Sequence, residues 1–135
     1  MKNIHLIPYR VEQVTAAPPR IPEGVRMIQA PEVWESAEHG KGNVVAVLDT
    51  GCQTDHPDLE ARIVGGRNFT HDDGGDPERF EDYNGHGTHV AGTIAGTGAL
   101  SSDREYRGIA PNARLLVLKV LDATGGGYTS DVIRA

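Results

Sequence analysis

Several kinds of residue are scarce in this chain of 135 residues. A single cysteine, Cys52, rules out a disulfide within the chain and fits a reducing compartment. The net charge is −6 and no run of lysine and arginine occurs, so nucleic acid is not expected as a partner. No apolar run approaches the roughly 18 residues of a membrane span, so we expect no membrane partner.

The first residues do not have the pattern of a secretory signal. Met1–Arg10 reads M-K-N-I-H-L-I-P-Y-R, and a signal needs an apolar core of about 7–15 residues. We therefore expect a cytoplasmic protein. Prolines are frequent up to residue 22, which predicts an extended N-terminal extension over 1–22 and a folded unit over 23–135. Termini are often disordered tails, but a tail without a binding role rarely carries as many apolar side chains as Ile4–Tyr9.

Two continuous apolar runs predict the central strands of a sheet. They are V-V-A-V-L, within Asn43–Leu48, and A-R-L-L-V-L-K-V-L, over Ala113–Leu121. Such runs are typical of parallel strands that are buried on both faces. Ile63–Phe69 is expected to form a shorter strand between them in sequence.

Helices are expected between and after these strands. His86–Gly96 contains small residues that permit close packing, and a helix begins at Ser130. Ala30–His39 predicts a short helix in which Val33, Trp34 and Ala37 supply the buried stripe. The alternation of strands and helices indicates an α/β fold with a mainly parallel sheet flanked by helices, incomplete in this chain.

Asp49 ends the first apolar run, where ligands of parallel sheets bind. A carboxylate at the end of a buried strand needs hydrogen bonds. One interpretation is a plain turn, because Asp49–Gly51 reads D-T-G, which is good turn chemistry. The other is that Asp49 accepts a hydrogen bond from His86 and orients its imidazole for proton transfer.

His86 and His89 lie three residues apart in the expected helix. A metal pair is one interpretation, but zinc-binding helices favour a spacing of four with a nearby glutamate. We expect His89, further into the helix, to be structural. His86 is flanked by Gly85 and Gly87, which leave it the access that a general base requires.

The motifs V-A-V-L-D-T-G and H-G-T-H-V-A-G-T-I-A-G, ending at Gly51 and Gly96, resemble those of the subtilisin-like serine proteases, the subtilase family. So do Asp55–Leu59, Gly108–Ala113 and Lys119–Asp122. The resemblance implies a serine endopeptidase that hydrolyses peptide bonds in intracellular proteins, with Asp49 as the orienting acid and His86 as the general base. A nucleophilic serine in a G-T-S-M-A context does not occur among these residues, so we expect it in the remaining C-terminal part of the protease.

The resemblance also assigns roles to both ends of the chain. Gly125, Gly126 and Gly127 correspond to an edge strand that pairs with the substrate backbone, although a glycine linker is the simpler interpretation. Leu6–Arg10, L-I-P-Y-R, resembles the N-terminal extension of the intracellular subtilisins of bacilli, which is implied to lie across the active site and keep the enzyme inactive. Leu6, Ile7 and Tyr9 are then expected to fill substrate pockets, while Pro8 spoils the cleavage geometry. Removal is expected by cleavage between about Val11 and Pro19.

Other roles rest on single residues. Asp58 corresponds to a ligand of a structural calcium ion in many subtilases, and a salt-bridged carboxylate is the alternative. No catalytic cofactor is expected. Cys52 is expected to be a small buried residue rather than a nucleophile. Intracellular relatives suggest a homodimer.

The second functional hypothesis is a non-catalytic peptide-binding or regulatory fragment, and a metal hydrolase is the third.

Overall fold

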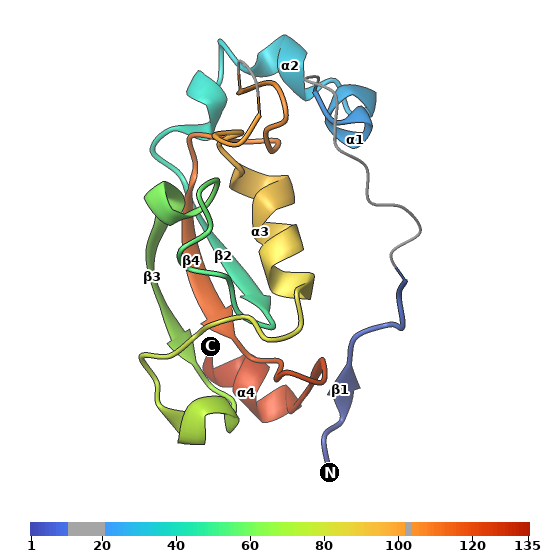
Figure 1. The fold of residues 1–135 in the computed structure, drawn as a ribbon, viewed down its shortest axis with the longest axis vertical. Helices are drawn as coiled ribbons and strands as arrows, with labels where there is room; N and C mark the ends of the chain where they lie inside the picture. The colour runs from blue at the N-terminus through green and yellow to red at the C-terminus, as the bar shows by residue number, and fades with distance from the viewer. Residues whose placement is uncertain (11–20, 102–103) are drawn as a thin grey trace.

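The computed structural model describes residues 1–10, 21–101 and 104–135, and the predicted cleavage region 11–19 lies outside them. Three parallel strands form the central sheet in the order β2 (Val44–Asp49), β4 (Arg114–Lys119), β3 (Ile63–Asn68). Both long apolar runs are therefore strands and lie next to each other (Figure 1). The predicted α/β fold with a parallel sheet and flanking helices is confirmed.

Helix α3 (His86–Ala95) packs against one face of this sheet (Figure 1). Its Ala91 and Ala95 are buried against the strands, where their small side chains permit a close approach. The resulting core brings together residues from strands, helix and loops: Val47, Cys52, Leu59, Ala91, Ala95, Leu115 and Val117.

The other face of the sheet is not covered by the described residues. Val44, Leu48 and Val64 are exposed there, although the sequence predicted strands buried on both faces. The prediction was wrong for this chain because a run of apolar residues cannot indicate whether its second covering layer belongs to the same segment of sequence.

Two short helices, α1 (Glu23–Met27) and α2 (Ala30–Val33), form a second small core at the end of the molecule. Trp34 is buried in it, and its indole Nε1 donates a hydrogen bond to the carbonyl oxygen of Ile109 at 2.7 Å. The predicted stripe over Ala30–His39 is wrong in part, since Val33 and Ala37 are exposed. The α-helix ends at Val33, and the small core that it adjoins contains Trp34 but neither Val33 nor Ala37. The described residues also form the 3₁₀ turns η1 (Glu38–Gly40), η2 (Glu60–Arg62) and η3 (Asp72–Gly75).

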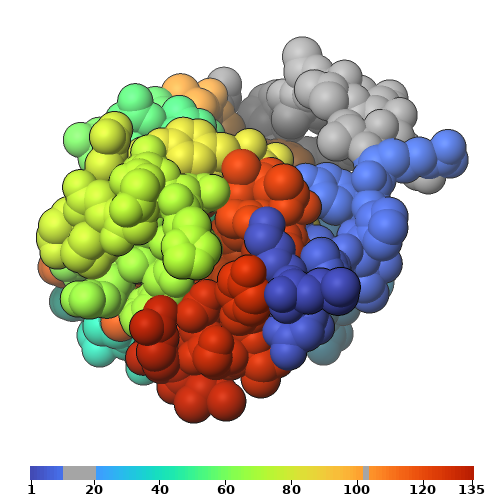
Figure 2. Space-filling model, turned by 90° about the horizontal axis from the view of Figure 1, so that it is seen from below, coloured from blue at the N-terminus to red at the C-terminus, as the bar shows by residue number. Residues whose placement is uncertain are grey.

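The first described residues lie beside the last. Strand β1 (Ile4–His5) pairs antiparallel with β5 (Gly126–Gly127), which directly precedes α4 (Thr129–Arg134). Figure 2 shows the first residues, in dark blue, against the orange and red C-terminal segment. None of the helices in the described ranges has the length and apolar character needed to cross a membrane.

Candidate active site

Asp49 and His86 form a hydrogen-bonded pair at the end of the sheet. Asp49 is the last residue of β2 and His86 the first of α3. The imidazole Nδ1 lies 2.9 Å from Oδ1 and 3.0 Å from Oδ2 of the carboxylate. Because a carboxylate only accepts, the proton of this bond resides on Nδ1, which directs the Nε2 lone pair away from Asp49. This is the arrangement that a general base requires from its orienting acid.

The backbone of α3 is held directly to the end of β2. The hydroxyl oxygen of Thr50 accepts a hydrogen bond from the Gly87 N–H at 2.9 Å. Gly87 approaches so closely that a Cβ atom there would lie 2.2 Å from the carbonyl oxygen of Gly51. Only glycine fits this contact without a backbone shift. The contact fixes the distance between the element that carries Asp49 and the one that carries His86.

Asp82 holds the N-terminus of α3. Its carboxylate accepts hydrogen bonds from the N–H groups of Asn84, Gly85 and Thr88 and from the Thr88 hydroxyl. It also accepts one from Thr50 at 2.8 Å. Burial opposes ionisation of Asp82, but the bonds from Thr88, Gly85 and Asn84 outweigh it and hold its pKa below the ordinary value. A negative charge at the N-terminus of a helix also interacts favourably with the helix dipole.

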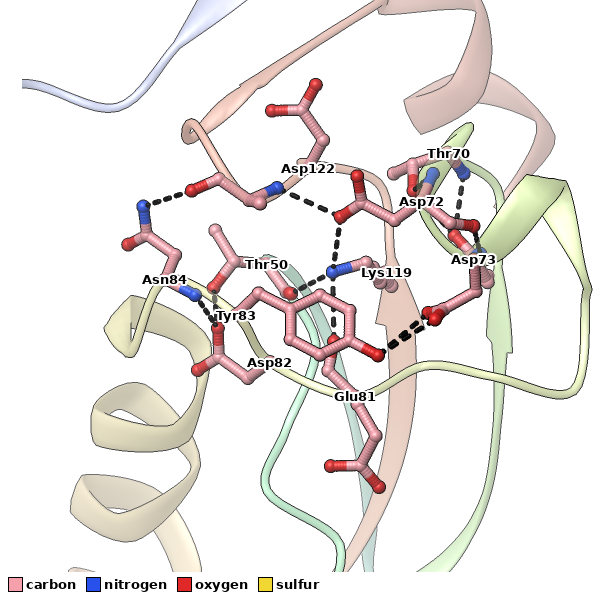
Figure 3. Close-up of polar contacts among 12 residues, drawn as sticks. Thr50, Thr70, Asp72, Asp73, Glu81, Asp82, Tyr83, Asn84, Lys119 and Asp122 are labelled. Carbon is pink, nitrogen blue, oxygen red and sulfur yellow. Dashed lines mark hydrogen bonds and ion pairs between the residues drawn. The ribbon is translucent and has the colours of Figure 1, made fainter.

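Lys119 joins the strand of Asp49 to the loops around it (Figure 3). Its side chain is 0% exposed, and its ammonium group donates to the carbonyl oxygens of Thr50 at 2.8 Å and Glu81 at 2.9 Å. The same group lies 3.0 Å from the Asp72 carboxylate. Asp72 in turn accepts a hydrogen bond from the N–H of Ala123, in the loop that leads to β5. One buried cation therefore braces both the Asp49–His86 pair and the approach to the glycine strand.

The glycine strand β5 is an edge to which the N-terminal extension is bound. The N–H of Leu6 donates to the carbonyl of Gly125 at 2.9 Å, and the N–H of Asn3 donates to the carbonyl of Gly127 at 3.1 Å. All three predicted substrate-binding glycines therefore lie at this edge, where they contact a peptide segment of the chain itself.

The four predicted residues of the extension have different surroundings. Leu6 packs on Gly125, and the ring of Tyr9 lies 5.6 Å from that of His86, between ring centres. The Tyr9 hydroxyl also donates to Oδ1 of Asn84 at 3.3 Å. Ile7 is 86% exposed and Pro8 is exposed as well, so the described residues provide no pocket that Ile7 fills. The extension therefore contacts the candidate base through Tyr9.

Asp58, His89 and Cys52, which the sequence analysis also singled out, are not part of the Asp49–His86 pair. Asp58 accepts a hydrogen bond from the Leu100 N–H at 3.0 Å. No group of three or more His, Cys, Asp or Glu side chains that could hold a metal ion occurs within the described ranges, and the role of Asp58 as a calcium ligand stays a prediction. His89 is exposed rather than structural.

Cys52 is 1% exposed and belongs to the core. Burial, together with the nearby carboxylates of Asp82 and Glu81, raises the pKa of its thiol to about 12. A thiol with that pKa is not a nucleophile at neutral pH, which agrees with the predicted packing role.

The subtilase family profile matches residues 40–135. The chain belongs to the subtilase family. It is 56% identical over 133 residues to the "Intracellular serine protease" of Paenibacillus polymyxa. The matched residues make up 98% of this chain and 40% of that protein. It is 52% identical over 124 residues to the "Major intracellular serine protease" of Bacillus subtilis (strain 168), covering 92% and 38%. An "Alkaline protease" of Alkalihalobacillus alcalophilus is 46% identical over 120 residues, covering 89% and 29%. This subtilase chain spans about two fifths of the length of the first two relatives.

Sequence reasoning assigned no role to three residues that organise the subtilase site, namely Thr50, Asp82 and Lys119, although Thr50 and Lys119 lie within its motifs. A signal for Asp82 exists, because an aspartate that closely precedes the first residue of a helix is a recognisable cap pattern. Thr50 and Lys119 carry no such signal, since their partners lie more than thirty residues away in sequence.

Proposed function

We propose that this chain is part of a serine endopeptidase and supplies Asp49 and His86 to its catalytic triad. The contact between Nδ1 of His86 and the Asp49 carboxylate carries the proposal. His86 takes the proton from the attacking hydroxyl and later gives it to the leaving amine, while Asp49 stabilises the imidazolium. The nucleophilic serine and its oxyanion-hole donor come from a part of the relatives' length that this chain does not span.

The remaining C-terminal part of the protease covers surfaces that this chain leaves open. A groove of about 860 Å³ runs between α1 and α3 and is lined by apolar groups including Val25, Ile28 and Ile109. The sheet face with Val44 and Leu48 is open as well. Exposed apolar areas of this kind mark surfaces that are covered in the assembled protein.

The N-terminal extension over 1–22 inhibits the folded unit over 23–135 until it is removed. Its β1 strand occupies the β5 edge, and Tyr9 lies against His86. Pro8 lacks an N–H and cannot continue the pairing, which keeps this segment from being cleaved as a substrate. Tethering makes weak contacts effective through a high local concentration. The protein acts on protein or peptide substrates in the cytoplasm, which is supported by two relatives that are named intracellular serine proteases. A homodimer and a calcium ion at Asp58 remain predictions.

The test is casein hydrolysis by a protein extended to the length of its relatives. His86→Ala should lower kcat at least about 10²–10⁴-fold, the contribution of a general base. His89→Ala, at the other histidine of the same helix, is the matched control and should lower kcat far less than His86→Ala, because His89 lines the groove between α1 and α3 rather than the Asp49–His86 pair. Normal casein cleavage by the His86→Ala protein would overturn the proposal.

A non-catalytic peptide-binding role is the second candidate, because β5 binds a peptide segment in this structure. The same assay separates the two. A longer protein that binds peptides along β5 but cleaves none would favour the binding role.

A further inference from the structure

Lys2 reaches from the bound extension to an acidic side chain beyond β5. Its ammonium group forms an ion pair with Oδ2 of Asp122 and lies 3.4 Å from the hydroxyl of Thr124. Its aliphatic stem passes over Gly126, where a Cβ atom would lie 2.9 Å from Lys2 Cδ. The glycine therefore leaves a path that a long side chain can follow along the strand.

The carboxylate of Asp122 is prepared for this contact by its own loop. Oδ1 accepts hydrogen bonds from the N–H and hydroxyl of Thr124 at 2.9 and 2.7 Å and from the N–H of Gly126 at 3.3 Å. Oδ2 meets Lys2. Figure 3 shows the Asp122 side chain directed away from Lys119 and Asp72. Burial disfavours the charge of Asp122, but the bonds from Lys2, Thr124 and Gly126 outweigh it and lower its pKa to about 2.

A neighbouring pair fixes the register in which the extension binds. The Thr129 N–H donates to Oδ1 of Asn3 at 2.9 Å, and the Asn3 amide donates to the Thr129 hydroxyl at 3.0 Å. With Ile4 opposite Gly127, this reciprocal contact leaves Lys2 no freedom to slide along the edge. A peptide in the same antiparallel register places the equivalent side chain at Asp122.

We propose that Asp122 forms a subsite for a lysine or arginine side chain of peptides and protein substrates that bind along β5. The inference rests on the proposed function, in which substrates take the place of β1 on this edge. With the extension bound the Asp122 side chain is 13% exposed, and its cation is lost when the extension leaves. A basic substrate residue restores the ion pair, whereas an apolar or acidic one leaves the desolvated charge unpaired.

The first arm of the test is a double-mutant cycle in the full chain. Docking of the extension is measured as hydrogen-exchange protection of the Leu6 N–H, which donates a hydrogen bond to the carbonyl oxygen of Gly125. Lys2→Met should lower protection about threefold to tenfold, as for a partly exposed ion pair, and Lys2→Arg should preserve it. In an Asp122→Asn background Lys2→Met should add nothing. Asparagine retains the Oδ1 acceptor, so the loop stays closed. Lys41→Met, at an exposed lysine that shortly precedes β2, controls for the loss of charge.

The second arm measures cleavage by the longer, processed protein. Peptides that differ only at the position of Lys2 should show a kcat/KM about threefold to tenfold higher with Lys or Arg than with Met, mainly through KM, because the subsite is remote from His86. Asp122→Asn should remove the difference.

The two arms separate the failure of each proposal. Equal kcat/KM values for the Lys and Met peptides would overturn the proposed subsite but leave the proposed protease function supported. If no peptide is cleaved, the proposed protease function is overturned. The double-mutant cycle still tests whether Asp122 is the partner of Lys2. If Lys2→Met lowers protection equally in both backgrounds, Asp122 is not the partner and the subsite is wrong.

Discussion

The ammonium group of Lys119 lies 3.0 Å from the carboxylate of Asp72, and the lysine side chain is completely buried. The contact joins the central strand β4 to the 3₁₀ turn η3, which follows β3. Both Thr50 and Glu81 also depend on this cation for hydrogen bonds to their carbonyl oxygens. A single substitution therefore removes several partners of buried acceptors at once.

Replacing Lys119 by methionine keeps most of the side-chain volume but removes the charge and every donor. We expect Lys119→Met to lower the free energy of unfolding by about 2–3 kcal/mol, because Asp72 is left as an unpaired, partly buried charge. Urea unfolding followed by Trp34 fluorescence measures this. Lys41→Met, at an exposed lysine, should change stability by less than about 0.5 kcal/mol. A Lys119→Met protein as stable as that control would show that the brace carries no net stability.

Two glycines of α3 should respond in opposite directions to alanine. Gly87→Ala introduces a Cβ atom 2.2 Å from the carbonyl oxygen of Gly51, so the helix must move away from β2 at a cost of about 1–3 kcal/mol. Gly92 has nothing within 4 Å of its added Cβ, so Gly92→Ala should stabilise the helix by about 0.5–1 kcal/mol.

Thermal unfolding of both variants gives the comparison, and the imidazole NMR signals of His86 report on the site. Only Gly87→Ala should shift them, because it separates the elements that hold Asp49 and His86. If both variants lose stability equally, loss of glycine flexibility rather than the close approach governs this helix.

Elements whose signal is local could be predicted from the sequence. Strands β2 and β4 follow from their apolar runs, and α3 follows from its small residues and its beginning at His86. Helix α1 was not predicted, since only Val25 of its five residues is buried and no apolar period develops. The same limit explains why the end of α2 at Val33 was missed.

Contacts between distant residues could not be predicted from patterns alone. Lys119 lies within an apolar run and gives no local indication that Asp72 and Glu81 supply its partners. The pair of Lys2 and Asp122 likewise depends on the register of β1 against β5, which only the fold defines. The motifs indicated Asp49 and His86, whereas the residues that hold them in position emerge from tertiary structure.

Cys52 should be unreactive in the folded chain. Its thiol is 1% exposed and its pKa is raised to about 12, mainly by burial, so almost no thiolate is present at pH 8. Ellman's reagent should therefore react only as urea unfolds the protein, with the two transitions at the same urea concentration. Stoichiometric reaction of the native chain at pH 8 would contradict the buried position.

Docking of the extension on β5 should be strongest across the neutral range and weaken at both extremes of pH. The pKa of Asp122 is lowered from 3.8 to about 2, so its contribution is complete above about 4 and is lost as the pH falls toward 2. The pKa of Lys2 is raised above 10.5, chiefly by its bond to Asp122, so its contribution is complete below 10.5 and is lost as the pH rises through the higher value. The ¹³Cα chemical shifts of Gly126 and Gly127 follow this docking directly. The combined Lys2→Met and Asp122→Asn variant is the control, because it lacks both titrating groups and should show neither transition. Acid and alkaline transitions that persist unchanged in that variant would assign the pH dependence to other groups, and a wild-type profile that is flat from pH 2 to 12 would show that the ion pair does not hold the extension.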